Sequence, residues 1–159
     1  MDAAGTSLLL LEVDQRRCAL PTGAVVELQR AVAQEPLPAA PAVVEGLIDL
    51  RGETVPVLDL RLRLGLAPRA PHPDHVLVVV DLDGRTVALR ADAALDVVEV
   101  PEEVIEDARD AVPGARFVAG LLHSPDGIVV IHDLAQFLSW EEATALDAAL
   151  ARGAPAGQR

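Results

Sequence analysis

The sequence LLLLEVDQRRCAL at residues 8–20 returns as LVVVDLDGRTVAL at residues 77–89. Five of the aligned positions are identical, and most of the others keep an apolar residue. A match of this length inside one chain is typical of an internal repeat, which decides the fold before any single element is considered. A true repeat should continue through the remainder of each copy.

The continuation of the repeat follows in the same order. Gly46 and Leu47 align with Gly120 and Leu121. From there the alignment continues without a gap, so Asp59 aligns with Asp133. The second copy carries a short insertion between about residues 101 and 115. The sequence therefore predicts a duplicated half-domain.

Each copy predicts β structure. The apolar runs are short, rich in β-branched residues and bounded by turn formers, which favours strands over core helices. These runs are residues 8–13, 54–58, 76–82 and 128–131. Asp83-Gly84, Asp126-Gly127 and Arg51-Gly52 lie between apolar runs, where glycine supplies the positive φ of a tight hairpin.

Short helices are expected after the last strand of each copy. Asp59 and Asp133 are suited to accept hydrogen bonds from the first free amides of a helix, and Gly65 is suited to end one. Ser139 and Glu142 have the spacing of a capping box that opens a terminal helix. These two aspartates are therefore interpreted as structural.

The predicted fold is all-β, with two small five-stranded barrel lobes in tandem, short helices and a C-terminal helix. A single domain at 8–150 is expected, with flexible ends at 1–7 and 151–159. Within it we expect lobe 1 at about 8–66, lobe 2 at about 75–138 and the helix at about 139–150.

Composition excludes several classes of function. Thirteen basic residues, all arginine, stand against 25 acidic residues, and a formal charge of −12 disfavours nucleic acid as a partner. The absence of lysine removes a P-loop and a Schiff base. The single cysteine, Cys18, allows no disulfide, and no apolar run reaches the roughly 18 residues of a membrane span. A cytoplasmic protein is expected.

The sequence gives little support to catalysis, a cofactor or a metal site. His72 and His75 lie in a proline-rich segment that we interpret as a solvated linker. His123 and His132 fall near the ends of two strands, and we interpret them as a surface or partly buried pair of side chains and not as a site. A hydrolytic or metal enzyme would require these four histidines to converge in space. We therefore expect no enzyme, no cofactor and no metal.

The chemically distinctive feature is Arg51. An arginine placed on a turn between two apolar strands, with Gly52 behind it, offers a planar donor fork suited to a carboxylate or carbonyl group on a partner. The spacing alone is also consistent with Arg51 being a solvated residue of the turn that binds no partner.

The block at residues 44–61, VEGLIDLRGETVPVLDLR, resembles the signature of the CheW family of chemotaxis coupling proteins. The signature has glycine, two apolar residues, Asn-Leu-Arg-Gly, and then a proline and Asp-Leu within an apolar strand. Here Asp49 replaces the asparagine, and Arg90 stands where the family commonly has an apolar residue. The likeness runs in family order over residues 8–150.

This resemblance implies two SH3-like barrels and a non-enzymatic adaptor. Its partners would be the regulatory domain of the histidine kinase CheA and the cytoplasmic tip of methyl-accepting chemoreceptors, with recruitment to membrane-bound receptor arrays. By the same resemblance, Gly46 and Gly52 permit the backbone of the motif. Partner contacts are carried over to Arg51, Val25 and Glu27, and less directly to Val87 and Leu89 in a groove between the lobes. A carboxylate at Asp49 could pair with Arg51 and reduce what the arginine offers to a receptor, so this departure bears on partner specificity.

A second hypothesis is a double barrel that binds a small molecule. It would require the groove between the lobes to be a closed apolar pocket with a few convergent polar groups.

Overall fold

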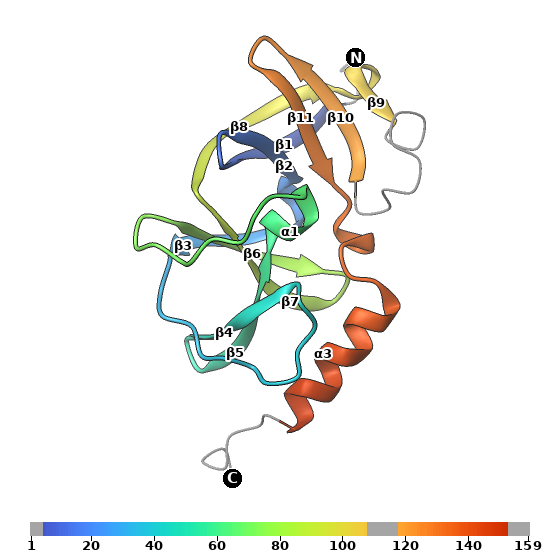
Figure 1. Ribbon diagram of the computed structural model, residues 1–159. Helices are drawn as coiled ribbons and strands as arrows, with labels where there is room; N and C mark the ends of the chain where they lie inside the picture. Colours follow the sequence, from blue (N-terminus) through green and yellow to red (C-terminus); the bar gives the residue numbers. More distant parts are fainter. Residues whose placement is uncertain (1–4, 108–117, 153–159) are drawn as a thin grey trace.

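The residues described by the computed structural model, 5–107 and 118–152, form two β-sheets with few helices (Figure 1). The strands are β1 (Gly5–Val13), β2 (Arg16–Pro21), β3 (Val25–Arg30), β4 (Val44–Leu50), β5 (Glu53–Asp59), β6 (Val76–Leu82), β7 (Arg85–Ala91), β8 (Ala93–Pro101), β9 (Ile105–Asp107), β10 (Val118–Ser124) and β11 (Gly127–His132). The helices are α1 (Leu60–Leu64), α3 (Trp140–Arg152) and the 3-10 turns η1 (Thr22–Ala24), η2 (Glu102–Val104) and η3 (Leu134–Gln136). The all-β prediction is confirmed.

The two sheets have the orders β8-β1-β2-β11-β10-β9 and β3-β6-β7-β5-β4. We call the lobe formed by the first of these sheets lobe A and the lobe formed by the second lobe B. Lobe B has the five strands expected, whereas lobe A has six because the short strand β9 extends its edge. Neighbours are antiparallel in both sheets except for the pairs β5–β7 and β2–β11, which are parallel.

Neither lobe is a consecutive half of the chain. The first hairpin of the first copy, β1–β2, lies in lobe A with the last strands of the second copy, and the hairpin β6–β7 lies in lobe B. Lobes at 8–66 and 75–138 were therefore a wrong prediction, because the copies exchange their first hairpins. The internal alignment establishes which segments are equivalent, but not which copy each hairpin packs with.

The exchange joins the lobes at equivalent positions. In lobe B, Val57 of β5 lies opposite Ala88 of β7, and in lobe A, Ile131 of β11 lies opposite Ala19 of β2. The internal repeat aligns Val57 with Ile131 and Ala19 with Ala88. The two parallel strand pairs, β5–β7 and β2–β11, thus form between equivalent residues of the two copies, which supports the duplication.

Each sheet also closes toward a barrel in the same way. In lobe B, the backbones of Glu35 and Leu47 exchange hydrogen bonds of 2.8 and 2.7 Å in an isolated antiparallel bridge. In lobe A, Glu106 of β9 lies opposite Leu121, the repeat equivalent of Leu47. The closing segment is a full strand in one lobe and a single bridge in the other.

Glycine is required beside each closing segment. A Cβ atom on Gly46 would lie 2.8 Å from the carbonyl oxygen of Glu35, and one on Gly120 would lie 2.7 Å from Cγ2 of Ile105. Real Cβ atoms do not approach other atoms so closely, so these two positions need glycine for close approach of the chain.

The predicted helix signals are found in the structure. The carboxylates of Asp59 and Asp133 accept hydrogen bonds from the amides two residues on, at 2.8 and 3.1 Å. Gly65 ends α1 with φ 73°. The amides of Ser139 and Glu142 each donate to the side chain of the other residue, which completes the expected capping box.

The ends of the chain differ slightly from expectation. Strand β1 begins at Gly5, so residues 5–7 are not a flexible end, and α3 continues to Arg152. The remainder of the two expected flexible ends, residues 1–4 and 153–159, lies outside the described residues. The same holds for most of the insertion that the alignment places between about residues 101 and 115.

One apolar core runs through both lobes. It includes residues of both exchanged hairpins and of α3, among them Leu11, Leu20, Val80, Leu89, Phe137 and Leu146. Cys18 is part of this core, and burial raises the pKa of its thiol to about 12. It is therefore a small core residue in its thiol form.

Gly46→Ala is expected to lower the free energy of unfolding by about 1–3 kcal/mol, because the added methyl group forces the closing segment of lobe B away from β4. Gly23→Ala is the matched control, since a Cβ atom there meets nothing within 4 Å. Urea unfolding of both variants measures the difference. Equal midpoints would show that the close approach does not constrain the fold.

Candidate partner-binding site

The turn between β4 and β5 places Arg51 at the surface of lobe B. Arg51 has φ 52° and Gly52 has φ 91°, the left-handed geometry of a tight hairpin turn. The carboxylate of Asp49 accepts a hydrogen bond of 2.8 Å from the amide of Gly52, which holds the turn closed. The backbone of Arg51 is therefore fixed while its side chain, 70% exposed, projects into solvent.

Arg51 pairs with Glu27, which lies on the edge strand β3. Both guanidinium nitrogens Nη1 and Nη2 donate to the carboxylate, one of them at 3.2 Å. The hydrogen bond from Arg51 holds the pKa of the Glu27 carboxyl below its usual value. The carboxylate that pairs with Arg51 is therefore that of Glu27 and not that of Asp49, which accepts a hydrogen bond within the turn. The structure brings together Arg51 and Glu27, two of the residues assigned to partner contact by the resemblance.

Strand β3 carries apolar side chains beside this ion pair. Val26 is 58% exposed and Leu28 is also exposed, while Val25 is half-buried and packs against the core. The pairing of β3 with β6 shifts between Val25 and Glu27, so a bulge falls at Val26. We define the tip site as Arg51, Glu27, Val25, Val26 and Leu28.

Val87 and Leu89 do not line a groove. Both are fully buried in the core on β7, which has neighbours on both sides in lobe B, so the prediction that they contact a partner is wrong. Accessible apolar residues lie instead on β8, the edge strand of lobe A, where Leu95 and Val97 are exposed. Strands β3 and β8 occupy equivalent edges of the two sheets.

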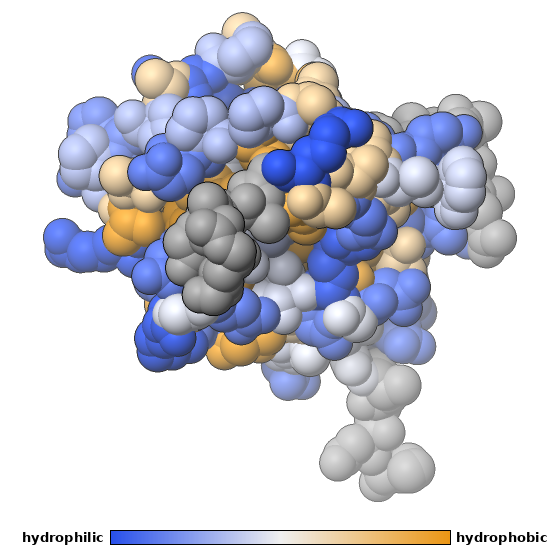
Figure 2. Space-filling view, turned by 90° about the horizontal axis from the view of Figure 1, so that it is seen from below, coloured by the Kyte–Doolittle hydropathy of each residue, from blue (hydrophilic) through white to orange (hydrophobic). Residues whose placement is uncertain are grey.

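The surface of the molecule mixes apolar and charged areas. Figure 2 shows one face, seen from below, on which hydrophobic residues gather in patches between hydrophilic ones. Alternation of this kind is typical of a surface that can desolvate an apolar area while charges around it orient a partner.

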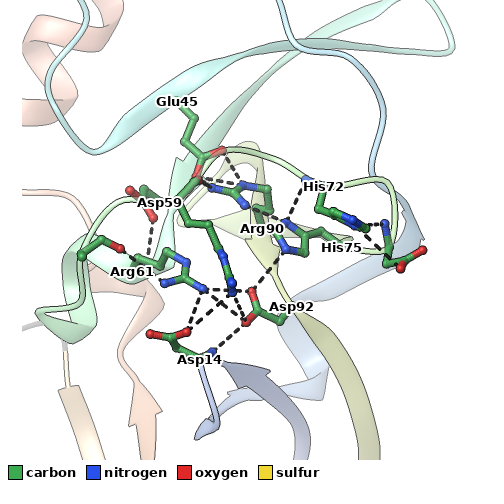
Figure 3. A network of polar contacts seen from close by, with 11 residues as sticks. Asp14, Glu45, Asp59, Arg61, His72, His75, Arg90 and Asp92 are labelled. Carbon is green, nitrogen blue, oxygen red and sulfur yellow. Dashed lines mark hydrogen bonds and ion pairs between the residues drawn. The ribbon is translucent and has the colours of Figure 1, made fainter.

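Behind the surface, a buried polar network joins the two lobes (Figure 3). Its centre is Arg90 at the end of β7, whose Nε donates to Glu45 of β4 at 2.8 Å. The same guanidinium donates to the carbonyl oxygen of Arg69 and contacts Nδ1 of His75, both at 2.7 Å. Arg90 and Glu45 are both largely buried. The arginine that departs from the family pattern is thus a structural residue.

A second buried arginine holds the point where the chain crosses between lobes. Asp92 is the single residue between β7 of lobe B and β8 of lobe A. Its carboxylate accepts a hydrogen bond of 2.7 Å from the amide of Asp14 and lies 3.3 Å from Nη2 of buried Arg61. Asp92 therefore ties the crossing to the β1–β2 turn and to α1.

The expectation of a solvated linker at His72 and His75 holds only in part. His72 is exposed, but His75 is buried within the network, where its Nε2 lies 3.6 Å from Asp92. Burial, and then the nearby Arg90 cation, hold the pKa of the His75 imidazole below its ordinary value. His75 is therefore a neutral imidazole near neutral pH.

The other two histidines lie at opposite ends of the β10–β11 hairpin. His123 is exposed and pairs with Glu106 at 3.1 Å, whereas His132 is buried with its ring edge against Phe137. Within residues 5–107 and 118–152, no three histidine, cysteine or acidic side chains are grouped so that they could hold a metal ion.

Fold and surface together define a two-lobed β-barrel binding module whose buried charges are structural and whose edge strands carry exposed apolar and charged side chains. The chain belongs to the CheW family: the model of the CheW-like domain matches residues 7–142. In the described part of the chain, no helix has the length and apolar character needed to cross a membrane.

Individual relatives agree with this assignment. The chemotaxis protein CheW of Rhizobium meliloti (strain 1021) is 29% identical over 140 residues, which cover 87% of this chain and 90% of that protein. The probable chemotaxis protein CheW of Rhizobium etli is 31% identical over 111 residues, covering 69% of this chain and 72% of that protein. The crystal structure of the scaffolding protein TtCheW from Thermoanaerobacter tengcongensis superimposes with a TM-score of 0.78 at 25% identity, covering 87% of this chain and 96% of that one.

Glu45→Gln is expected to lower the free energy of unfolding by about 3 kcal/mol, because it leaves the buried guanidinium of Arg90 without its carboxylate. Asp126→Asn removes the partner of Arg17 at the surface and should cost less than about 1 kcal/mol. Denaturant unfolding compares them. Similar small losses in both variants would mean that the buried pair carries no more free energy than the exposed one.

The stability of the protein should fall as the pH is lowered from about 7.5 to about 5, a range that spans the ordinary pKa of histidine. The pKa of His75 is depressed in the folded state, so the unfolded chain takes up a proton first and folding is then opposed. His75→Gln should flatten this dependence. Unfolding midpoints across this pH range measure it; an unaltered slope in His75→Gln would contradict the assignment.

Proposed function

We propose that this chain is a signalling adaptor that couples methyl-accepting chemoreceptors to the regulatory domain of the histidine kinase CheA. Its membership of the CheW family carries the proposal, and its structural relative TtCheW, a scaffolding protein, supports it. The adaptor would work without chemistry, by holding both partners at separate surfaces of one rigid body.

The tip site is proposed to receive the kinase. Arg51 stands on a fixed turn, so little backbone entropy is lost when its side chain engages a partner. Glu27 accepts hydrogen bonds from two of the guanidinium nitrogens and so orients the planar group at the surface. Val26 and Leu28 would supply apolar area that becomes buried beside these charges.

Receptor helices are proposed to contact the apolar edge of lobe A. Leu95 and Val97 are exposed on β8 and would pack against the apolar face of a helix. Because β3 and β8 are edge strands of different sheets, both contacts could be made at the same time. Weak contacts of this kind become firm in an array, where each further contact forms at high local concentration. In this proposal the protein is cytoplasmic and is recruited to receptor arrays.

Arg51→Ala is expected to weaken binding to a CheA regulatory domain by about tenfold, which is typical for truncation of an arginine at an interface centre. Arg152→Ala, at the exposed end of α3, is the matched control and should bind as the wild type does. Titration calorimetry with the purified regulatory domain measures the affinities, and co-sedimentation with receptor tips measures the second contact.

Two results would count against this proposal. Unchanged affinity in a folded Arg51→Ala protein would remove the tip site, and the absence of binding by the wild type to either partner would remove the adaptor function itself.

A further inference from the structure

The two copies of the repeat end differently. In the first copy, Gly65 stops α1 in the left-handed conformation, and the chain leaves toward β6. The equivalent position in the second copy is Ser139, which instead caps the long helix α3. Lobe B therefore carries a helix at a place where the described residues of lobe A provide none.

Helix α3 occupies a defined groove on lobe B. Leu146 and Ala149 are fully buried in the core cluster, against which Leu47 and Leu138 also pack. At the rim, Asp147 of α3 forms an ion pair of 2.8 Å with Arg85, the first residue of β7. The surface that holds α3, which we call the seat of α3, thus combines buried apolar side chains with one arginine, Arg85, at its edge.

The equivalent groove on lobe A is open in the described part of the chain. It is a hollow of about 670 Å³ between α1 and strands β2, β10 and β11. The repeat aligns Arg16, which lines this hollow, with Arg85, which binds Asp147 of α3. It also aligns the lining residues Leu64, Val118 and Leu121 with Leu138, Val44 and Leu47, which belong to or pack against the core cluster that contains Leu146 and Ala149.

We propose that this open groove binds an amphipathic, acidic α-helix of another protein. The geometry of α3 specifies its chemistry: small and medium apolar residues spaced as Leu146, Ala149 and Leu150, and a carboxylate that reaches Arg16 as Asp147 reaches Arg85. A second copy of α3 is not available as the occupant, since its apolar residues are buried in its own chain.

Charge supports an acidic occupant. Arg16, Arg17 and Arg63 all line the hollow, in a chain whose formal charge is −12. Arg17 and Arg63 already pair with Asp126 and Glu142. Arg16 is exposed on the first residue of β2, at the position that its equivalent uses to bind α3. Asp126 also lines the hollow, so Arg16 is the lining arginine that favours a carboxylate on the occupant, as Arg85 does for Asp147 of α3.

The chain provides its own probe, a fluorescein-labelled peptide with the sequence of residues 139–152. Fluorescence anisotropy with the full-length protein should show saturable binding. Arg16→Glu and Ile128→Glu, the latter at a lining position that is 53% exposed, should each weaken binding at least about fivefold through charge reversal or an added repulsive charge. A peptide carrying Asp147→Arg should recover affinity for Arg16→Glu.

Arg85→Glu is the matched control, because it alters the seat of α3 and not the open groove. Binding to this variant should equal that to the wild type. Loss of binding in Arg85→Glu with retention in Arg16→Glu would mean that the peptide displaces α3, and would overturn the proposal. So would the absence of saturable binding, or equal affinity of the wild type and both groove variants.

Discussion

The parallel pairing of β5 with β7 and of β2 with β11 is the constraint on which the rest of this structure depends. Each lobe is completed by a hairpin from the other copy, so neither half of the chain contains the strands that its own barrel needs. The chain must cross between the two sheets twice, through η1 and at Asp92. Because the lobes also share one apolar core, we expect them to move as one body.

The charges of the protein divide into two groups by position. Arg61 and Arg90 are buried where the lobes meet, and each is satisfied by a carboxylate and a backbone carbonyl. A buried pair of this kind adds little net stability over an apolar pair, so we assign it the role of fixing how the copies fit together. Arg51 and Arg16 are exposed, at the tip of lobe B and at the rim of the open groove. Buried arginines thus join the lobes, whereas Arg51 and Arg16 are the exposed arginines that we propose contact partners.

Much of the fold could be predicted from local chemistry, because the repeat, the caps at Asp59 and Asp133 and the turn at Arg51 follow from residue types. The hairpin exchange could not be predicted, because it is decided by long-range packing. Val87 and Leu89 were misassigned although the apolar run of residues 87–89 is typical of a central strand buried on both faces. The burial of Arg90 had one signal, a charge that directly follows this run and precedes Ala91.

Fragment complementation tests the hairpin exchange most directly. Residues 1–70 and 71–159 would be produced separately and examined by circular dichroism and denaturant unfolding, alone and in equimolar mixture. Because each fragment lacks strands of both barrels, the exchange predicts no cooperative unfolding for either fragment alone and a single native-like transition for the mixture. A cooperative transition in either isolated fragment would contradict it.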